Sequence, residues 1–373
     1  MVIKVKERKK IGKAPRLLCV IMLFLMSALP LNAWACRLLE PPEDRIDTLW
    51  VHLDGFCLAS AQREWAIKGA DVLEALKTGK NLDFQGALIV DDVMLDELPL
   101  RSVAEIPHLP SQIQERLSKK GLEKVRVIPA SITIRDSQFE KVFATNLTDD
   151  VLVIVGEVHI SGTTFLQSVD FSKIIFVKPL VFSKVKVEHE GFFIGAQFEG
   201  AVDFSHTSFG THSRFHKAVF RGPVTFAEVA FQGVAEFLEV EFQQTANFSH
   251  TQFLSGTGFS GSVFHGPVDF SGVKTKQEIY FRFSEFKERV SFRQGQFQAM
   301  VDFSNSRFSG EHDFTDAEFA VQPEFTGSNI SVEAPISWRR LNQQTQWLFF
   351  GGLVILVGFY LWITKRRTPG HST

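Results

Sequence analysis

The chain of 373 residues contains only three cysteines, with no Cys-x-x-Cys pair and no Cys/His cluster at zinc-ligand spacing. These counts exclude a disulfide-rich scaffold. Neither sign of charge is in excess, since 40 basic side chains balance 42 acidic ones to a formal net charge of −2, which gives the whole chain no reason to bind nucleic acid. Tyrosine is nearly absent, with 2 residues against 38 phenylalanines. Such a bias indicates a repeat that fills one structural position again and again.

Phenylalanine recurs every eleven residues from Phe171 onward, and a second apolar series lies five residues behind each member of the first. Alternating steps of five and six fit neither the helical period of 3.6 nor the strand period of 2. An eleven-residue period also occurs in right-handed coiled coils, but Phe, Ser, Gly, Thr and Val dominate here, which disfavours a helix. The sequence therefore predicts a solenoid, with a structural core that includes Phe204, Phe215, Phe226, Phe237, Phe248, Phe259, Phe270, Phe281, Phe292, Phe303, Phe314 and Phe325.

The segment Ala246-Asn247-Phe248-Ser249-His250 fits the unit Ala-(Asp/Asn)-(Leu/Phe)-polar-x, and many other units come close. In these units the chain resembles the pentapeptide-repeat family, strongly over 160–330 and weakly over 84–160. The resemblance implies an all-β fold, a right-handed quadrilateral parallel β-helix with the Phe inward and the residue two before it packed beside the ring. Every second unit here carries a sixth residue. We therefore expect about 22 residues per coil, with a corner bulge on two of the four sides.

The first 35 residues combine a basic start with an apolar run and end in Ala33-Trp34-Ala35, small residues at the positions that a signal peptidase reads. Residues 1–35 are thus predicted to be a signal peptide that is cleaved before Cys36. An uncleaved signal anchor is the alternative, because the apolar run is nearly long enough to span a bilayer. Lipid modification of Cys36 is a third and poorer option.

The C-terminal region contains an uncharged stretch over 347–363 that ends just before Lys365, Arg366 and Arg367. Its length and flanking aromatic residues predict a transmembrane helix, and the positive-inside rule places the tail, 364–373, in the cytoplasm. A buried soluble helix is the weaker alternative. These segments predict a single-pass inner-membrane protein whose solenoid lies outside the cytoplasm, joined to the membrane by a linker, 333–346. That location would permit a Cys36–Cys57 disulfide.

Between the termini we expect a small, partly helical cap over 36–83, irregular first coils over 84–160 and the regular β-helix over 161–332. The regular rhythm is interrupted at about 101–124 by what is predicted to be a helical insertion, with a capping box at Ser111 and Gln114 and a terminating Gly121. The cap would shield the first coil from solvent.

Positions two repeats apart should stack, which places His206, Glu228 and His250 in one outward row. A metal would need all three donors about 2.0–2.2 Å from it, so we interpret this row as a solvated polar face. A second row contains Asp203, Asp269 and Asp313, whose carboxylates lie coils apart, too far for the pair that glycoside hydrolysis needs. We predict no catalytic, cofactor-binding or metal-binding residues, and no cofactor.

The sequence favours a non-enzymatic, membrane-tethered scaffold that presents a rigid surface to an unidentified protein or envelope component; no nucleic-acid partner is expected, and the oligomeric state stays open. One alternative is a β-helix enzyme that acts on envelope polysaccharide. Another is a DNA-mimicking, topoisomerase-binding protein, which requires a cytoplasmic solenoid.

Overall fold

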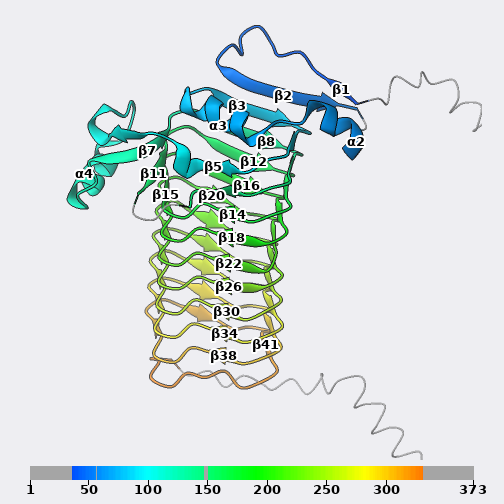
Figure 1. Ribbon diagram of the computed structural model, residues 1–373. Coiled ribbons are helices and arrows are strands. Elements are labelled where there is room, and N and C mark those ends of the chain that lie inside the picture. Colours follow the sequence, from blue (N-terminus) through cyan, green and yellow to red (C-terminus); the bar gives the residue numbers. More distant parts are fainter. Residues whose placement is uncertain (1–35, 56, 147–149, 331–373) are drawn as a thin grey trace, which may run out of the picture.

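The computed structural model describes residues 36–55, 57–146 and 150–330. Over this part the chain winds into a rod of stacked β-coils (Figure 1). Strands pair in parallel with the strand one coil further along, so that Val202 pairs with Val224 and Val224 with Ala246. Equivalent positions in neighbouring coils, such as Val240 and Ser262, have a sequence separation of 22. The all-β parallel solenoid and the predicted coil length are therefore confirmed. The strands form four sheets, one on each side of the coil, and we number these I to IV in the order in which a coil visits them.

Sheet I has 12 described strands: β1 (Arg37–Leu38), β2 (Thr48–Asp54), β3 (Asn81–Gln85), β8 (Ile132–Arg135), β12 (Val158–Ser161), β16 (Leu180–Ser183), β20 (Val202–Asp203), β24 (Val224–Thr225), β28 (Ala246–Asn247), β32 (Val268–Asp269), β36 (Val290–Ser291) and β40 (His312–Asp313). Sheet II has 10 described strands: β4 (Leu88–Ile89), β9 (Gln138–Phe139), β13 (Thr164–Phe165), β17 (Lys186–Val187), β21 (Ser208–Phe209), β25 (Ala230–Phe231), β29 (Gln252–Phe253), β33 (Lys274–Thr275), β37 (Gln296–Phe297) and β41 (Glu318–Phe319).

Sheet III has 9 described strands: β5 (Val93–Met94), β10 (Phe143–Ala144), β14 (Val169–Asp170), β18 (Glu190–Phe192), β22 (His212–Arg214), β26 (Val234–Glu236), β30 (Thr257–Gly258), β34 (Ile279–Tyr280) and β38 (Val301–Asp302). Sheet IV has 10 described strands: β6 (Leu100–Ser102), β7 (Lys124–Ile128), β11 (Leu152–Ile154), β15 (Ile174–Phe176), β19 (Gln197–Phe198), β23 (Val219–Phe220), β27 (Glu241–Phe242), β31 (Val263–Phe264), β35 (Glu285–Phe286) and β39 (Arg307–Phe308).

Two kinds of corner alternate around each coil, and they explain the steps of five and six. The five-residue corner follows a Phe of the first series and puts its second residue in the left-handed region, as at Lys217 with φ 56° and Glu228 with φ 58°. The six-residue corner brings successive coils into close backbone contact. A Cβ added to Gly233 at such a corner would lie 1.8 Å from the carbonyl oxygen of Thr211 in the coil before it. The extra residue thus occupies two of the four corners.

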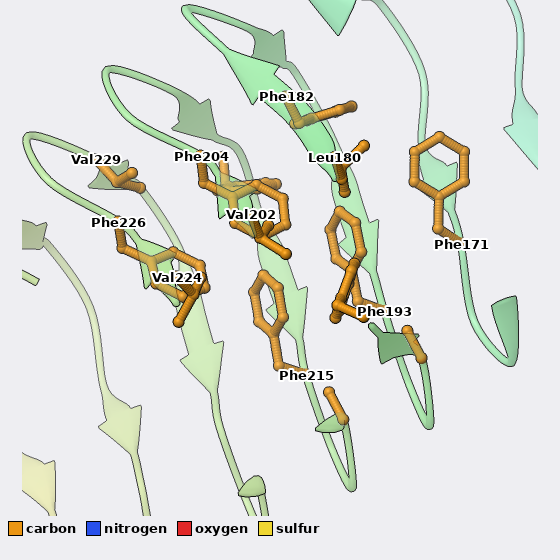
Figure 2. Packing of buried hydrophobic residues seen from close by; sticks show 14 of the residues in the cluster. Phe171, Leu180, Phe182, Phe193, Val202, Phe204, Phe215, Val224, Phe226 and Val229 are labelled. Carbon is orange, nitrogen blue, oxygen red and sulfur yellow. The ribbon is translucent and has the colours of Figure 1, made fainter. Parts of the chain in front are cut away.

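The interior of the rod is filled by phenylalanine rings (Figure 2). Rings one coil apart stack face to face, as in Phe226 on Phe248, with centroids 4.8 Å apart and planes 4° apart. Rings half a coil apart meet edge to face, as in Phe226 against Phe237 at 5.4 Å and 90°. Each buried ring contributes about 4–6 kcal/mol from about 150–250 Å² of burial before entropy is counted, so this stack is the main source of stability.

The twelve phenylalanines predicted from the sequence to form the core differ in their degree of burial only at the C-terminal end of the rod. Those from Phe204 to Phe303 are buried, whereas Phe314 and Phe325 are half-buried and pack against the core. The residues two positions before the rings are buried too, including Val202, Ala246 and Val301. This matches the packing that the pentapeptide pattern implies.

The N-terminal end is covered by the segment before β3 (Figure 1). β1 pairs antiparallel with β2, and β2 adds in parallel to β3, extending sheet I beyond the first coil. The described helices here are α2 (Ala59–Gln62), the 3₁₀ turn η2 (Arg63–Trp65) and α3 (Gly69–Lys77), which places Val72, Leu73 and Leu76 in the main core. A disulfide joins Cys36 to Cys57. The segment therefore continues the sheet as well as covering the core.

A second, smaller core lies outside sheet IV. The helix α4 (Ser111–Lys119) packs Ile113 and Leu117 against strands β7, β11 and β15, next to the short turn η4 (Val103–Glu105), whereas the turn η3 (Leu95–Glu97) places Leu95 in the main core. The predicted capping box is wrong in detail. Pro110 is the N-cap and no side chain caps the helix, because Ser111 is already the first helical residue; the Gln114 amide donates instead to the carbonyl of Leu109.

No helix among the described residues is long and apolar enough to cross a membrane. The predicted signal segment (1–35), linker (333–346), transmembrane helix (347–363) and tail (364–373) lie outside the described residues.

Candidate functional site

In the outward row of His206, Glu228 and His250, only two of the three side chains are in contact. His206 Nδ1 lies 3.2 Å from Glu228 Oε2, and both side chains are about half exposed. The ring of His250, one coil further on, lies over Gly272, where an added Cβ would be 2.5 Å from its Nδ1. In the part of the chain that the structure describes, no group of three or more His, Cys, Asp or Glu side chains is arranged to hold a metal ion. This row therefore offers a close contact between His206 and Glu228 and no coordination site.

The row that contains Asp203, Asp269 and Asp313 forms hydrogen bonds within the turns at the five-residue corners. Asp203 Oδ1 accepts a hydrogen bond from the backbone N–H of Ser205 at 2.8 Å, and Asp269 does the same for Ser271. Asp313 accepts the equivalent hydrogen bond from the N–H of Thr315 at 2.9 Å, and this bond and one from the Thr315 hydroxyl lower the pKa of Asp313. Along this row of sheet I, the acidic or polar residue before the ring thus stabilises the five-residue corner, as Asx turns do.

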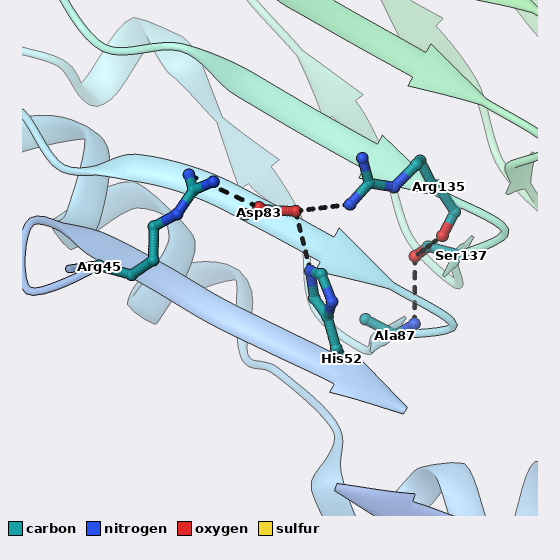
Figure 3. Close-up of polar contacts among 6 residues, drawn as sticks. All are labelled: Arg45, His52, Asp83, Ala87, Arg135 and Ser137. Carbon is teal, nitrogen blue, oxygen red and sulfur yellow. Dashed lines mark hydrogen bonds and ion pairs between the residues drawn. The ribbon is translucent and has the colours of Figure 1, made fainter. Parts of the chain in front are cut away.

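A partly buried polar network lies where the N-terminal segment meets the first coils (Figure 3). Asp83 Oδ1 is 2.8 Å from His52 Nε2 and accepts a hydrogen bond from Arg135 at 3.1 Å, while Arg45 lies 3.9 Å from the other oxygen. The nearby Ser137 hydroxyl donates to the carbonyl of Arg135 and accepts from the N–H of Ala87. The hydroxyl is engaged by the backbone on both sides, so the network joins β2, β3 and β8 and does not form a catalytic triad.

The outer face of sheet III, which faces the viewer in Figure 1, departs most from the polar pattern of the other sides. Each of five successive coils has three outward positions here, and the register stacks these positions in rows. From the N-terminal side, the successive coils present Glu190, Phe192 and Ile194; His212, Arg214 and His216; Val234, Glu236 and Leu238; Gly256, Gly258 and Ser260; and Glu278, Tyr280 and Arg282. The coil with two glycines interrupts these ridges.

A groove of about 350 Å³ results at this interruption. We call it the glycine groove; its lining residues are Val234, Glu236, Leu238, Gly256, Thr257, Gly258, Ser260, Tyr280 and Arg282. The outward side chains of the coil before β30 form its first wall, those of the coil after β30 form its second wall, and the backbone of β30 forms its floor. The groove thus offers a concave surface on a rod whose interior is filled.

Three basic side chains surround the carboxylate of Glu236 in the first wall. Oε2 is 2.9 Å from His212 Nε2 and 3.3 Å from His216 Nε2, and it accepts a hydrogen bond from Arg214 Nε at 3.0 Å. Burial raises the pKa of Glu236, but the His212 hydrogen bond and the charges of His216, His212 and Arg214 outweigh it, so the net pKa is lowered. Glu236 is therefore a fixed, charge-compensated acceptor.

The second wall is an aromatic ring held by a guanidinium. Arg282 Cζ lies 4.8 Å from the ring centroid of Tyr280, and Arg282 Nε donates to the carboxylate of Asp302. Phe283 follows directly, 64% exposed and with a φ of 57°. A large side chain seldom adopts this conformation, and here it keeps an aromatic ring in solvent at the residue that follows Arg282.

Sequence reasoning missed the glycine groove because outward positions carry no periodic signal. Two features of the sequence nevertheless coincide with the groove. Gly256 and Gly258 occupy the outward places in their unit, and Tyr280 is one of 2 tyrosines in a chain with 38 phenylalanines.

Comparison with known proteins agrees with the fold. Residues 226–274 match the family model described as pentapeptide repeats (9 copies), which makes this part of the chain similar to that family. The matched coils include the first wall and the floor of the glycine groove. No curated protein and no solved structure matches the chain.

Proposed function

We propose that this protein is a non-enzymatic scaffold, tethered to the inner membrane by a single C-terminal span, that presents its pentapeptide-repeat solenoid outside the cytoplasm to a protein or envelope component. The solenoid is a structural repeat fold, and binding uses its outer surface. The scaffold has no cofactor in this proposal.

The observation that carries the proposal is the contrast between the inside and the outside of the rod. The interior is closed by stacked rings from Phe204 to Phe303. The outer face of sheet III instead combines half-buried Tyr280 and Leu238 with fixed charges around a groove. Tyrosine and arginine are enriched where proteins make their strongest contacts, which favours a binding role for this face.

The location is supported by the terminal segments and by the Cys36–Cys57 disulfide, since disulfides persist in oxidising compartments. Charge does not favour the DNA-mimic alternative, because the chain's net charge is only −2.

The test is an alkaline phosphatase fusion after Val332, expressed with and without residues 1–35, and a second fusion after Thr373. The proposal expects activity from the first fusion only when residues 1–35 are present, and none from the fusion at Thr373. A stable but inactive fusion after Val332 would contradict the extracytoplasmic placement and favour a cytoplasmic binding role. Equal activity at both points would contradict the C-terminal span.

A further inference from the structure

The glycine groove is not explained by the packing of the chain itself. Neither Gly256 nor Gly258 has a positive φ among the described residues. A Cβ on Gly256 would meet nothing within 4 Å, and one on Gly258 would meet only the end of the Leu238 side chain at 3.0 Å. By contrast, Gly233 is fixed by backbone contact with the coil before it. Glycine inside a strand weakens the strand and often marks a place where a ligand approaches closely.

The size of the groove restricts its occupant. Its walls belong to coils on either side of β30, so their backbones are about 9.6 Å apart at about 4.8 Å per strand. The volume of about 350 Å³ lies at the lower end of the range of about 300–1,000 Å³ for small-ligand pockets. One or two flat rings fit this slot, whereas a folded domain would contact only its rim.

The charges of the groove are already compensated within the protein. Glu236 has Arg214, His212 and His216 as partners, and Arg282 has Asp302. A charged ligand would have to compete with these pairs. An uncharged ligand with many hydroxyl groups can instead form hydrogen bonds to these charged groups without separating the pairs. Such bonds are favourable because a hydrogen bond to a charged group is stronger than one between neutral groups.

The contacts of Glu236 within the described residues all go to Oε2, which leaves Oε1 as an acceptor for a ligand hydroxyl. Across the groove, the guanidinium of Arg282 covers one face of the Tyr280 ring and holds the ring in place, so that only the opposite face can receive a ligand. The face of an aromatic ring is electronegative and attracts the slightly positive C–H groups on one side of a sugar ring. The groove therefore places a stacking platform opposite a fixed acceptor.

From this arrangement we infer that the glycine groove binds an uncharged saccharide segment of an envelope glycan, with Tyr280 as the stacking platform and Glu236 as the hydroxyl acceptor. The inference rests on the proposed function, in which the solenoid faces the cell envelope. It requires binding alone and no bond breaking.

The experiment titrates chitotetraose and maltotetraose into the full-length chain, kept in a detergent without a sugar headgroup, by isothermal calorimetry. Labelled tyrosine locates the binding by NMR, because the chain has only 2 tyrosines and Tyr360→Phe assigns the second signal. Saturable binding of at least one oligosaccharide with a shift of the Tyr280 signal is expected. No saturable binding of either oligosaccharide would overturn the inference.

Two substitutions test the groove in different ways. Gly256→Thr fills it and Tyr280→Ala removes the platform, and each should weaken binding by about tenfold or more, whereas Tyr280→Phe keeps the ring and should stay within about threefold. Ala230→Thr, which adds a similar side chain to the outer face of sheet II, is the matched control and should leave affinity unchanged. Affinity unchanged by both groove substitutions would place the saccharide elsewhere and overturn the inference.

The outcome is separable from that of the proposed function. An active phosphatase fusion without saccharide binding overturns only the inference and leaves a protein as the partner of this face. Saccharide binding with an inactive fusion keeps the groove as a saccharide site but overturns both the location and the envelope origin of the ligand.

Discussion

Replacing one ring in the middle of the phenylalanine stack should cost more stability than replacing one at its C-terminal end. Phe248 stacks on Phe226 at 4.8 Å and on Phe270 at 4.9 Å, whereas Phe314 stacks on a single ring of the described part of the chain, Phe292, also at 4.9 Å. A stacked aromatic pair contributes about 0.5–1.5 kcal/mol beyond its buried area. The stacking loss in Phe248→Leu is therefore about 1–3 kcal/mol, against about 0.5–1.5 kcal/mol in Phe314→Leu.

The same geometry predicts which pairs of rings are coupled. Phe226 and Phe248 are in contact, so a double-mutant cycle with Leu at both positions should give a coupling free energy of about 0.5–1.5 kcal/mol. Phe204 and Phe248 lie two coils apart, and their substitutions should be additive within about 0.5 kcal/mol. In a solenoid each coil contacts only its neighbours, which is why the coupling should end after one coil.

The assay is equilibrium unfolding of the full-length chain in urea, followed by two spectroscopic probes whose transitions must coincide. Equal losses for Phe248→Leu and Phe314→Leu would refute the idea that stacking on both sides distinguishes the middle of the rod. Coupling between Phe204 and Phe248 as large as that between Phe226 and Phe248 would refute nearest-neighbour stability.

Three further predictions concern the corners, the N-terminal segment and the wall of the groove. Gly233→Ala should lower the unfolding midpoint strongly, because its Cβ would lie 1.8 Å from the Thr211 carbonyl oxygen, whereas Gly256→Ala should leave it unchanged or slightly raised; thermal unfolding compares the two. Reduction of the disulfide, which closes a loop with a sequence separation of 21, should destabilise the N-terminal segment by about 3 kcal/mol. Hydrogen exchange should then rise in β1 and β2 and stay unchanged in β24 to β40. Because the pKa of Glu236 is lowered below its ordinary value of 4.5, its contribution to stability is present above that pH and is lost as the pH falls through the folded-state pKa. Unfolding midpoints of Glu236→Gln should therefore fall less steeply in acid than those of the unaltered chain, and identical slopes would contradict the role given to His212, His216 and Arg214.

The core positions and the coil length of this structure could be predicted from the sequence because the interior of every coil must be filled in the same way. A position that must fill the interior selects Phe each time, as at Phe226 and Phe248, and the steps of five and six then give the coil length. The left-handed corners also recur every eleven residues, yet Lys217, Glu228 and Gly261 occupy equivalent places. The fold imposes this conformation on whichever residue is there, so no residue type marks it.

The N-terminal segment and the groove were harder to predict for a different reason. β2 contains mostly half-buried residues, and its sequence does not distinguish it from any other short strand. Its parallel pairing with β3 depends on contacts with residues about 33 positions further along the chain, and no local pattern indicates them. The groove depends on the stacking of Glu236, Gly258 and Tyr280, which pair in register across three successive coils. Their proximity becomes visible only when the register is known, and their chemistry only when their partners are.

In a repeat of this kind, function is best sought where an outward position departs from the surrounding rows. The rings and the corner residues are needed for the fold in every coil, so they carry no information about a partner. Gly256 and Tyr280 satisfy no such need: a side chain would fit at the first, and the second is a tyrosine where neighbouring coils of the same sheet present Arg214, Glu236 or Asp302. Both border one groove, and a substitution at either one tests that groove without disturbing the rings that hold the rod together.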